Sequence, residues 1–215
     1  MKKLTLLLAL MASAFVNNPV DAQKTVNLFN GKDLSNWDFV VEGNKVPASD
    51  VYYVQDGLIR IAGQPIGYMY TKEIYKNFKL HVEWRWVDGK ESNSGIFVLV
   101  EDVKNPFPKA VECQLHAGDA GDFVLLGGSD LIEYQKEKNK PRPEFPVVKK
   151  DKESTEKAAG EWNEANIFVR DGVITVYING VYQNTGTSLT KEGHVALQSE
   201  GGPIEFRNVK LTPME

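Results

Sequence analysis

Residues 78–86 read Phe-Lys-Leu-His-Val-Glu-Trp-Arg-Trp, and this stretch decides the class of fold. Apolar residues occupy every second position, with polar or charged residues between them. Side chains of a β-strand point alternately to opposite faces, so the pattern predicts a strand with one face in a hydrophobic core. The same alternation recurs at 110–116, where apolar residues alternate with Glu112, Gln114 and His116.

Further short segments have the composition of strands, and turn signals separate them. They are residues 25–29, 51–54, 57–62, 67–71, 94–101, 122–126, 165–170, 173–178, 193–198 and 203–211. Asp171-Gly172 and Asn179-Gly180 predict hairpin turns, because the central residues of such turns need a positive φ. Roughly a dozen short strands without a helical apolar period predict an all-β fold, a two-sheet antiparallel sandwich of the jelly-roll type. One domain, residues 23–215, accounts for them.

The alternation also predicts which residues form the core of the sandwich. These residues are Leu80, Val82, Trp84, Ile96, Val111, Leu115, Ile167, Val169, Val176 and Leu197. Trp86 is expected beside them. Trp37 and Trp162 lie near strand ends, where they are either core residues or part of a ligand groove.

The first 22 residues have the three parts of a secretory signal peptide. Lys2 and Lys3 precede an apolar run at 4–16, and the small-residue end at 20–22 follows. The run is short for a membrane span, and the alternative is a buried N-terminal helix. We expect cleavage after Ala22, with no membrane span and a periplasmic location if the cell has two membranes.

Composition excludes several classes of function. The chain has 25 Lys and Arg residues against 29 Asp and Glu residues, a net charge of −4. Binding to duplex nucleic acid needs a basic face, so nucleic acid is not an expected partner. Cys113 is the only cysteine, which excludes an intramolecular disulfide and a four-cysteine zinc site.

No cofactor and no metal are expected. A zinc site built from His81, His116 and His194 is disfavoured, because they lie on separate predicted strands. A structural calcium would need a loop dense in carboxylates, and no such loop stands out. Cys113 alternates with polar residues and is expected in the core, which disfavours a thiol nucleophile.

Residues 136–160 are too polar for a core and too rich in proline for a central strand. One interpretation is a solvated excursion. The other is a loop folded over one mouth of the sandwich, since long loops often carry binding groups.

The face formed by Glu112, Gln114 and His116 is the best candidate site. A carboxylate, an amide and an imidazole two residues apart suit hydrogen bonding to sugar hydroxyls and proton transfer. Glu83 and Arg85 are expected on the same face from another strand. The alternative is a solvated sheet face with cross-strand ion pairs.

Several segments together resemble the 3-keto-disaccharide hydrolase domain family. They are residues 28–37, 93–97, 112–115, 120–123, 160–163, 176–180, 193–198 and 201–209. The resemblance covers about residues 26–213. It implies a concanavalin A-like jelly roll and an exported hydrolase of glycosides oxidised at C3, with an oligosaccharide or glycoside as substrate.

The implied chemistry removes the C2 proton beside the ketone, eliminates the group at C1 and then adds water. Under this interpretation Glu112 is the general base or holds the sugar hydroxyls beside it, and His116 is an alternative acid or base. Arg207 either stabilises the enolate or forms an ion pair on the last strand. The expected substrate-binding residues are Gln114, Asn93, Glu83, Arg85, Gln198 and Glu200. A lectin-like module without turnover and a conventional glycosidase remain as alternatives.

Overall fold

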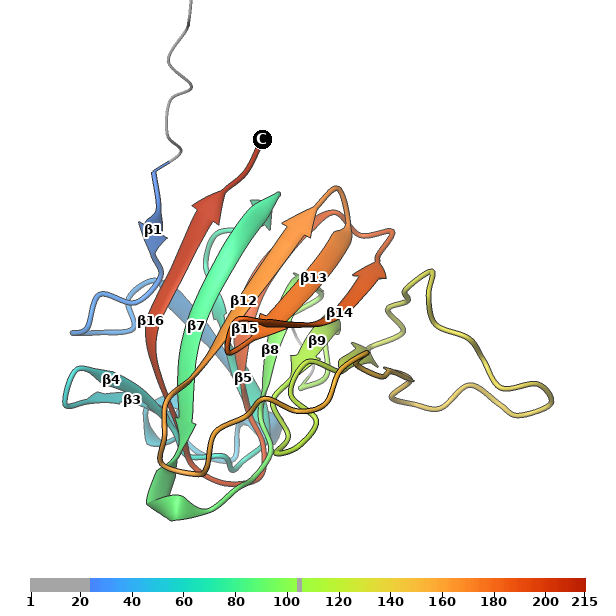
Figure 1. Ribbon diagram of the computed structural model, residues 1–215. Helices are drawn as coiled ribbons and strands as arrows, with labels where there is room; N and C mark the ends of the chain where they lie inside the picture. Colours follow the sequence, from blue (N-terminus) through green and yellow to red (C-terminus); the bar gives the residue numbers. More distant parts are fainter. Residues whose placement is uncertain (1–23, 104–105) are drawn as a thin grey trace, which may run out of the picture.

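The protein is described by a computed structural model that covers residues 24–103 and 106–215. Strands pair into two antiparallel sheets that pack face to face (Figure 1), which confirms the predicted two-sheet sandwich. The predicted signal peptide, residues 1–22, lies outside the described residues. Among the residues that the structure covers, no helix is long and apolar enough to cross a membrane.

Sheet A forms one layer. In spatial order its strands are β14 (Val181–Thr187), β13 (Val173–Ile178), β12 (Asn163–Arg170), β7 (Phe78–Trp86), β16 (Ile204–Pro213), β4 (Leu58–Ile61) and β3 (Tyr52–Gln55), and β1 (Val26–Asn27) pairs with β16.

Sheet B forms the second layer. Its order is β11 (Val147–Val148), β10 (Phe123–Leu126), β9 (Lys109–Gln114), β8 (Gly95–Glu101), β15 (Glu192–Ser199), β5 (Gly67–Thr71) and β2 (Trp37–Val41), and β6 (Tyr75–Lys76) pairs with β15. Short 3-10 turns occupy Glu42–Asn44, Ala48–Asp50 and Val87–Gly89.

The core between the sheets follows the predicted alternation. In β7 every apolar side chain is buried, and the polar residues between them are only partly so. All ten predicted core residues are buried in a single hydrophobic cluster, as are Trp37 and Trp86. The strand phase read from the sequence is therefore confirmed.

The predicted hairpin turns are confirmed as well. Asp171 and Gly172 have φ values of 50° and 89°, and Asn179 and Gly180 have values of 49° and 79°. The sequence prediction missed β2, β6, β11 and β14. The last of these has no clear apolar alternation and contains Gly186, while β6 and β11 are too short to show a period.

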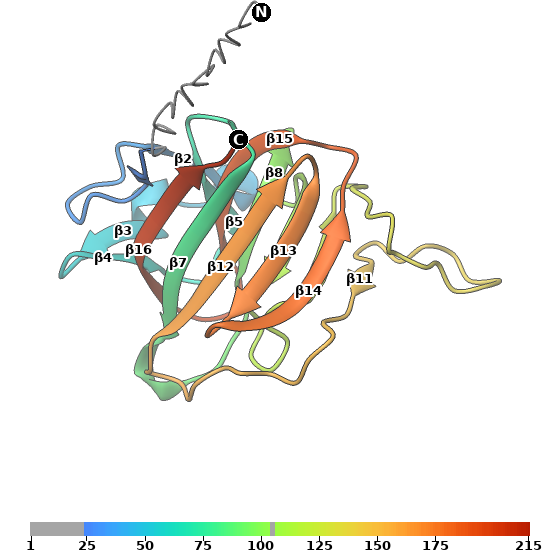
Figure 2. The same ribbon diagram turned by 45° about the horizontal axis from the view of Figure 1, so that its top comes forward.

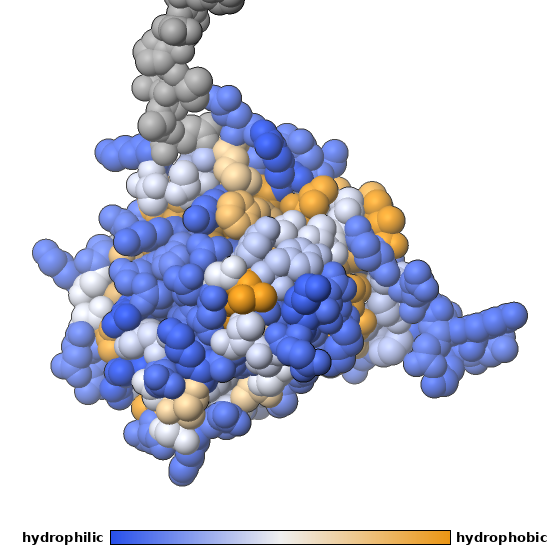
Figure 3. Space-filling model, viewed as in Figure 1, coloured by the Kyte–Doolittle hydropathy of each residue, from blue (hydrophilic) through white to orange (hydrophobic). Residues whose placement is uncertain are grey.

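The outer faces of the two sheets differ. That of sheet A is mainly hydrophilic (Figure 3). Sheet B instead has a second apolar cluster on its outer face, formed by Tyr68, Phe97, Val100, Ala110, Val124, Leu126 and Ala196. Sheet B is therefore apolar on both faces, and a polar group on its outer face is held in a largely apolar setting.

Each of the two interpretations of residues 136–160 describes one part of the segment: the first part is solvated, and the second part packs against the sandwich. The connection between β10 and β11 projects from the sandwich (Figure 2), and residues 136–141 are exposed. Beyond it the chain returns to the edge of sheet B as β11, and Lys149 and Lys150 then contact the loop that follows β9. Only the second part of the segment is near a candidate site.

Truncation of a core leucine tests the packing of both sheets. We expect Leu80→Ala in sheet A and Leu115→Ala beyond β9 each to lower the free energy of unfolding by about 2–5 kcal/mol, because each leaves a buried cavity. Leu189→Ala is the control, since Leu189 is 84% exposed. Denaturant unfolding measures all three, and unchanged midpoints for both core variants would contradict the assigned strand phase.

Candidate active site

A cavity of about 250 Å³ opens on the outer face of sheet B. Its walls come from β9, β10, β11 and β15, together with residues that flank β8, β9, β11 and β15. The lining residues are Asn93, Phe107, Glu112, Gln114, Val124, Leu126, Phe145, Val147, Gln198 and Glu200. We call this cavity the sheet B pocket.

Strand register places the Glu112 carboxylate inside the sheet. Glu112 pairs with Val124 on one side and with Phe97 on the other. Its neighbours across the strands are therefore apolar, and Glu112 is only 2% exposed. The next outward position on β9 is Gln114, which pairs with Gly95.

Gly95 makes room for the carboxylate. A Cβ atom on residue 95 would overlap Oε1 of Glu112, so the side chain lies directly against the glycine backbone. Any larger residue would push Glu112 out of its position. The absence of a side chain is thus a requirement of the pocket, in line with the close approach that glycine permits.

The two carboxyl groups of the pocket have different surroundings. Burial, and secondarily the nearby Glu200, raises the pKa of Glu112 well above its ordinary value. Burial also raises the pKa of Glu200, but hydrogen bonds from Gln198 and Asn93 and the charge of His116 oppose that rise. Ionisation is therefore easier at Glu200 than at Glu112.

Three buried acceptors in this pocket lack partners. Oε1 of Glu112, Oδ1 of Asn93 and Oε1 of Gln198 receive no hydrogen bond from any residue that the structure describes. Buried polar atoms are ordinarily hydrogen-bonded, and leaving one unpaired costs free energy. Their convergence on one cavity offers acceptor atoms to the hydroxyl groups of a ligand.

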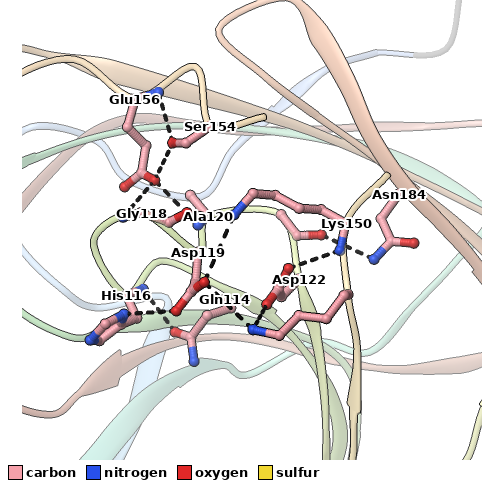
Figure 4. A network of polar contacts seen from close by, with 12 residues as sticks. Gln114, His116, Gly118, Asp119, Ala120, Asp122, Lys150, Ser154, Glu156 and Asn184 are labelled. Atoms are coloured by element: carbon pink, nitrogen blue, oxygen red, sulfur yellow. Dashed lines mark hydrogen bonds and ion pairs between the residues drawn. The ribbon is translucent and has the colours of Figure 1, made fainter. Parts of the chain in front are cut away.

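A polar network orders the rim of the pocket (Figure 4). Oε1 of Gln114 accepts hydrogen bonds from the backbone N–H groups of Leu115 and His116, each at 2.9 Å. His116 lies 3.1 Å from Asp119 through Nδ1, and its side chain is 52% exposed. Gln114 is thereby fixed with its NH2 group left for other contacts, and His116 stands at the edge.

The returning segment is clamped to the same rim (Figure 4). The buried carboxylate of Asp122 accepts hydrogen bonds from Nζ of Lys149 at 2.7 Å and from the backbone N–H of Lys150 at 2.8 Å. Oε2 of Glu156 accepts hydrogen bonds from the backbone N–H groups of Gly118 and Ala120. These bonds attach residues 149–156 to the loop at 116–122.

Three predicted site residues lie elsewhere, and the expectation that Glu83 and Arg85 share the face of Glu112 is wrong. Glu83 and Arg85 are on β7 and Arg207 is on β16, all in sheet A. Their side chains point to the outer face of that sheet, because residues 84, 86 and 206 fill the core. They belong to a different surface of the molecule.

These three residues have structural partners there. Nε of Arg207 lies 2.6 Å from Glu83, and Nε of Arg85 lies 2.6 Å from the buried Glu205. Both guanidinium groups also lie over the ring of Trp162, at 3.9 and 4.6 Å from its centroid. The alternative of a solvated sheet face with cross-strand ion pairs therefore describes the outer face of sheet A.

The sheet B pocket brings together the other predicted residues, Asn93, Glu112, Gln114, Gln198 and Glu200, with His116 near its edge. The sequence prediction did not include Phe107, Phe145 and Val147. Phe145 and Val147 are apolar residues inside a strongly polar segment, and this contrast is the signal that marks them.

No group of three His, Cys, Asp or Glu side chains suited to a metal ion occurs within 24–103 and 106–215. His81 lies on sheet A and His194 on sheet B, so they are not grouped. Cys113 is fully buried, and burial raises the pKa of its thiol, which disfavours a reactive thiolate.

The chain belongs to the family described as the 3-keto-alpha-glucoside-1,2-lyase-like domain, which matches residues 24–212. The resemblance read from the sequence is thereby confirmed. A curated relative, the 3-keto-disaccharide hydrolase of Bacteroides thetaiotaomicron, is 26% identical over 92% of this chain and 81% of the relative.

Solved structures support the fold. A candidate glycosyl hydrolase from Parabacteroides distasonis superposes with a TM-score of 0.64 at 23% identity, covering 89% of this chain and 94% of the other. The β-glucanase of Bacillus licheniformis superposes with a TM-score of 0.58 at 10% identity, covering 91% and 100%. The concanavalin A-like jelly roll expected from the sequence agrees with these likenesses.

The raised pKa of Glu112 predicts a pH-dependent stability difference. Above the ordinary pKa of glutamate, the Glu112 carboxyl group loses its proton in the unfolded chain but keeps it in the folded chain. The free energy of unfolding of the wild type therefore falls as the pH rises toward the pKa that Glu112 has in the folded chain. We expect Glu112→Gln to gain stability relative to wild type by about 1.4 kcal/mol per pH unit in that window.

Denaturant unfolding between pH 4 and 8 measures the difference. The control is Glu192→Gln, because Glu192 is exposed at the start of β15. A pH-independent difference between Glu112→Gln and wild type would show that Glu112 ionises normally in the folded chain.

Proposed function

We propose that this protein is a carbohydrate-active hydrolase that cleaves glycosides oxidised at C3. Family membership and the relative from Bacteroides thetaiotaomicron support this proposal. The observation that carries it is the convergence on one cavity of two carboxyl groups and two amide oxygens that have no hydrogen-bond partner among the described residues. Sugar hydroxyls donate hydrogen bonds, and the carboxyl groups can exchange protons.

The proposed reaction has two stages. A base removes the proton at C2, which the neighbouring ketone acidifies, and the resulting enolate expels the group at C1 while an acid protonates the departing oxygen. Water then adds across the new C1–C2 double bond, with its hydroxyl at C1 and a proton at C2. The sum is one water consumed, one alcohol released and one oxidised sugar released.

The environment of each carboxyl group suggests its role. Glu200 receives hydrogen bonds from two amides that stabilise its charge, so it is the general base in this proposal. Glu112 is buried and favours its protonated form, so it is the proton donor. This assignment moves the base from Glu112, where the sequence suggested it, because a base must be ionised.

The remaining polar residues orient the sugar. Gln198 and Asn93 hold Glu200, and their unpartnered oxygens are available to accept hydrogen bonds from hydroxyl groups. Gln114 offers its NH2 group, since its oxygen is engaged by the backbone. His116 lies at the edge, where its charge favours the ionised form of Glu200. The pattern of residues 1–22 supports export of the chain.

Replacement of each carboxyl group tests the proposal. We expect Glu200→Gln and Glu112→Gln each to lower kcat on a 3-keto-glucoside by about 10²–10⁴-fold, the scale of lost acid–base catalysis. Wild-type turnover in D₂O should place deuterium at C2 of the released sugar. The control is Glu192→Gln, and near-normal turnover by both pocket variants would place the chemistry elsewhere.

The pH profile separates the two roles. Activity should fall on the acid side as Glu200 is protonated and on the alkaline side as Glu112 is ionised, because each then loses its required form. Glu112→Gln should remove the alkaline limb from the residual activity and keep the acid limb. Loss of the acid limb instead would make Glu112 the base.

The choice of substrate tests the class of function. The same disaccharide should be offered with and without oxidation at C3. Release from the oxidised compound alone is the expected result. Release from both indicates a conventional glycosidase, and binding without release indicates a lectin-like module.

A further inference from the structure

The sheet B pocket has two halves of different chemistry. The polar half contains both carboxyl groups and the three amide side chains. The apolar half is formed by Phe107, Val124, Leu126, Phe145 and Val147. The proposed acid–base chemistry uses none of these five residues, so they need another explanation.

Strand directions bring the two phenylalanines together. β9 and β11 are both antiparallel to β10, so they run parallel to each other. Phe107 precedes the start of β9 and Phe145 precedes the start of β11, so both leave the sheet at the same end. Their ring centroids lie 4.9 Å apart with an interplanar angle of 54°.

The apolar half continues directly from the Glu112 row. Val147 pairs with Val124, and Val124 pairs with Glu112. Two strand spacings, about 10 Å, separate the backbones of residues 112 and 147. A sugar ring held at the carboxyl groups therefore leaves room for its C1 substituent above β10 and β11.

The apolar half also remains partly open. Phe145 is 36% exposed and Val147 is 39% exposed. None of the five side chains carries a hydrogen-bond donor or acceptor. Hydroxyl groups of a second sugar would lose water there without a replacement from these side chains, whereas an aromatic ring would bury apolar surface and pack edge-to-face.

We propose that this half of the pocket is a subsite for an aromatic leaving group, an inference that rests on the proposed function. The preferred substrates are then aryl or arylalkyl glycosides oxidised at C3, rather than disaccharides. The subsite binds the departing alcohol and takes no part in bond breaking. Water is consumed and the aromatic alcohol is released, as in the general scheme.

Kinetics with matched substrates test the subsite. Benzyl and methyl 3-keto-glucosides, as both anomers, have leaving groups of similar acidity, and oxidised trehalose supplies a sugar as leaving group. We expect kcat/KM to be about tenfold higher for the benzyl compound than for the methyl compound, the scale of an apolar pocket. Oxidised trehalose has a more acidic leaving group, so only its KM is compared, and we expect that KM to be no lower than the KM of the methyl compound.

Phe145→Ala should remove most of the benzyl preference, because it should lower kcat/KM for the benzyl compound much more than kcat/KM for the methyl compound. Phe168→Ala is the matched control, because Phe168 forms a comparable pair with Tyr177, at 5.8 Å, on β12 and β13 of sheet A. Two results would overturn the proposal. One is a benzyl preference that survives Phe145→Ala, and the other is a KM for oxidised trehalose below that of the benzyl compound.

Binding of unoxidised glucosides separates this proposal from the proposed function. Benzyl and methyl glucosides without the ketone are titrated calorimetrically into wild type and Phe145→Ala. If wild type releases nothing from any oxidised glycoside, the proposed reaction fails. Tighter wild-type binding of the benzyl compound, lost in Phe145→Ala, would still support the subsite, and equal affinities would then refute it.

Discussion

The contact between the carboxyl group of Glu112 and the backbone of Gly95 is the constraint on which the candidate site depends. It requires a strand with no side chain at residue 95, next to a strand that points a carboxyl group outward. The surrounding cross-strand neighbours are apolar, and among the described residues the carboxyl group has no cationic partner of the kind that a buried acid usually has. The raised pKa of Glu112 follows from this placement, and the proposed division of roles with Glu200 rests on it.

Sheet A also contains a buried glutamate, but there the glutamate has a structural role. Glu205 is also fully buried in its strand, but Arg60 and Arg85 both contact its carboxylate. Paired in this way, the charge of a buried carboxylate is compensated by cations. Glu112 and Glu205 are both buried, but their surroundings differ. Glu112 has no cation beside it among the described residues and lines a cavity, while Glu205 completes an ion-pair network.

Much of the fold could be predicted from local sequence because period-2 alternation reports directly on which face is buried. The same pattern placed Glu112 and Gln114 on one outward face. It could not assign that face to a sheet, because pairing is a long-range property. Glu83 alternates as cleanly as Glu112 does, yet it lies across the sandwich. The place of Phe145 in the pocket could not be predicted for a related reason. It depends on the return of the polar segment 136–160 to the edge of sheet B, which is also a long-range property.

The two halves of the sheet B pocket differ in how freely they can evolve. The polar half comes from residues on or next to β8, β9 and β15, where a change can disturb a sheet. Phe145 instead arrives on the connection that precedes β11, whose far end is anchored by Lys149, Lys150 and Glu156. That connection can vary in length or composition while the sheet stays intact. A change in this connection can therefore alter the proposed leaving-group subsite of this protein while the proposed acid–base pair stays in place.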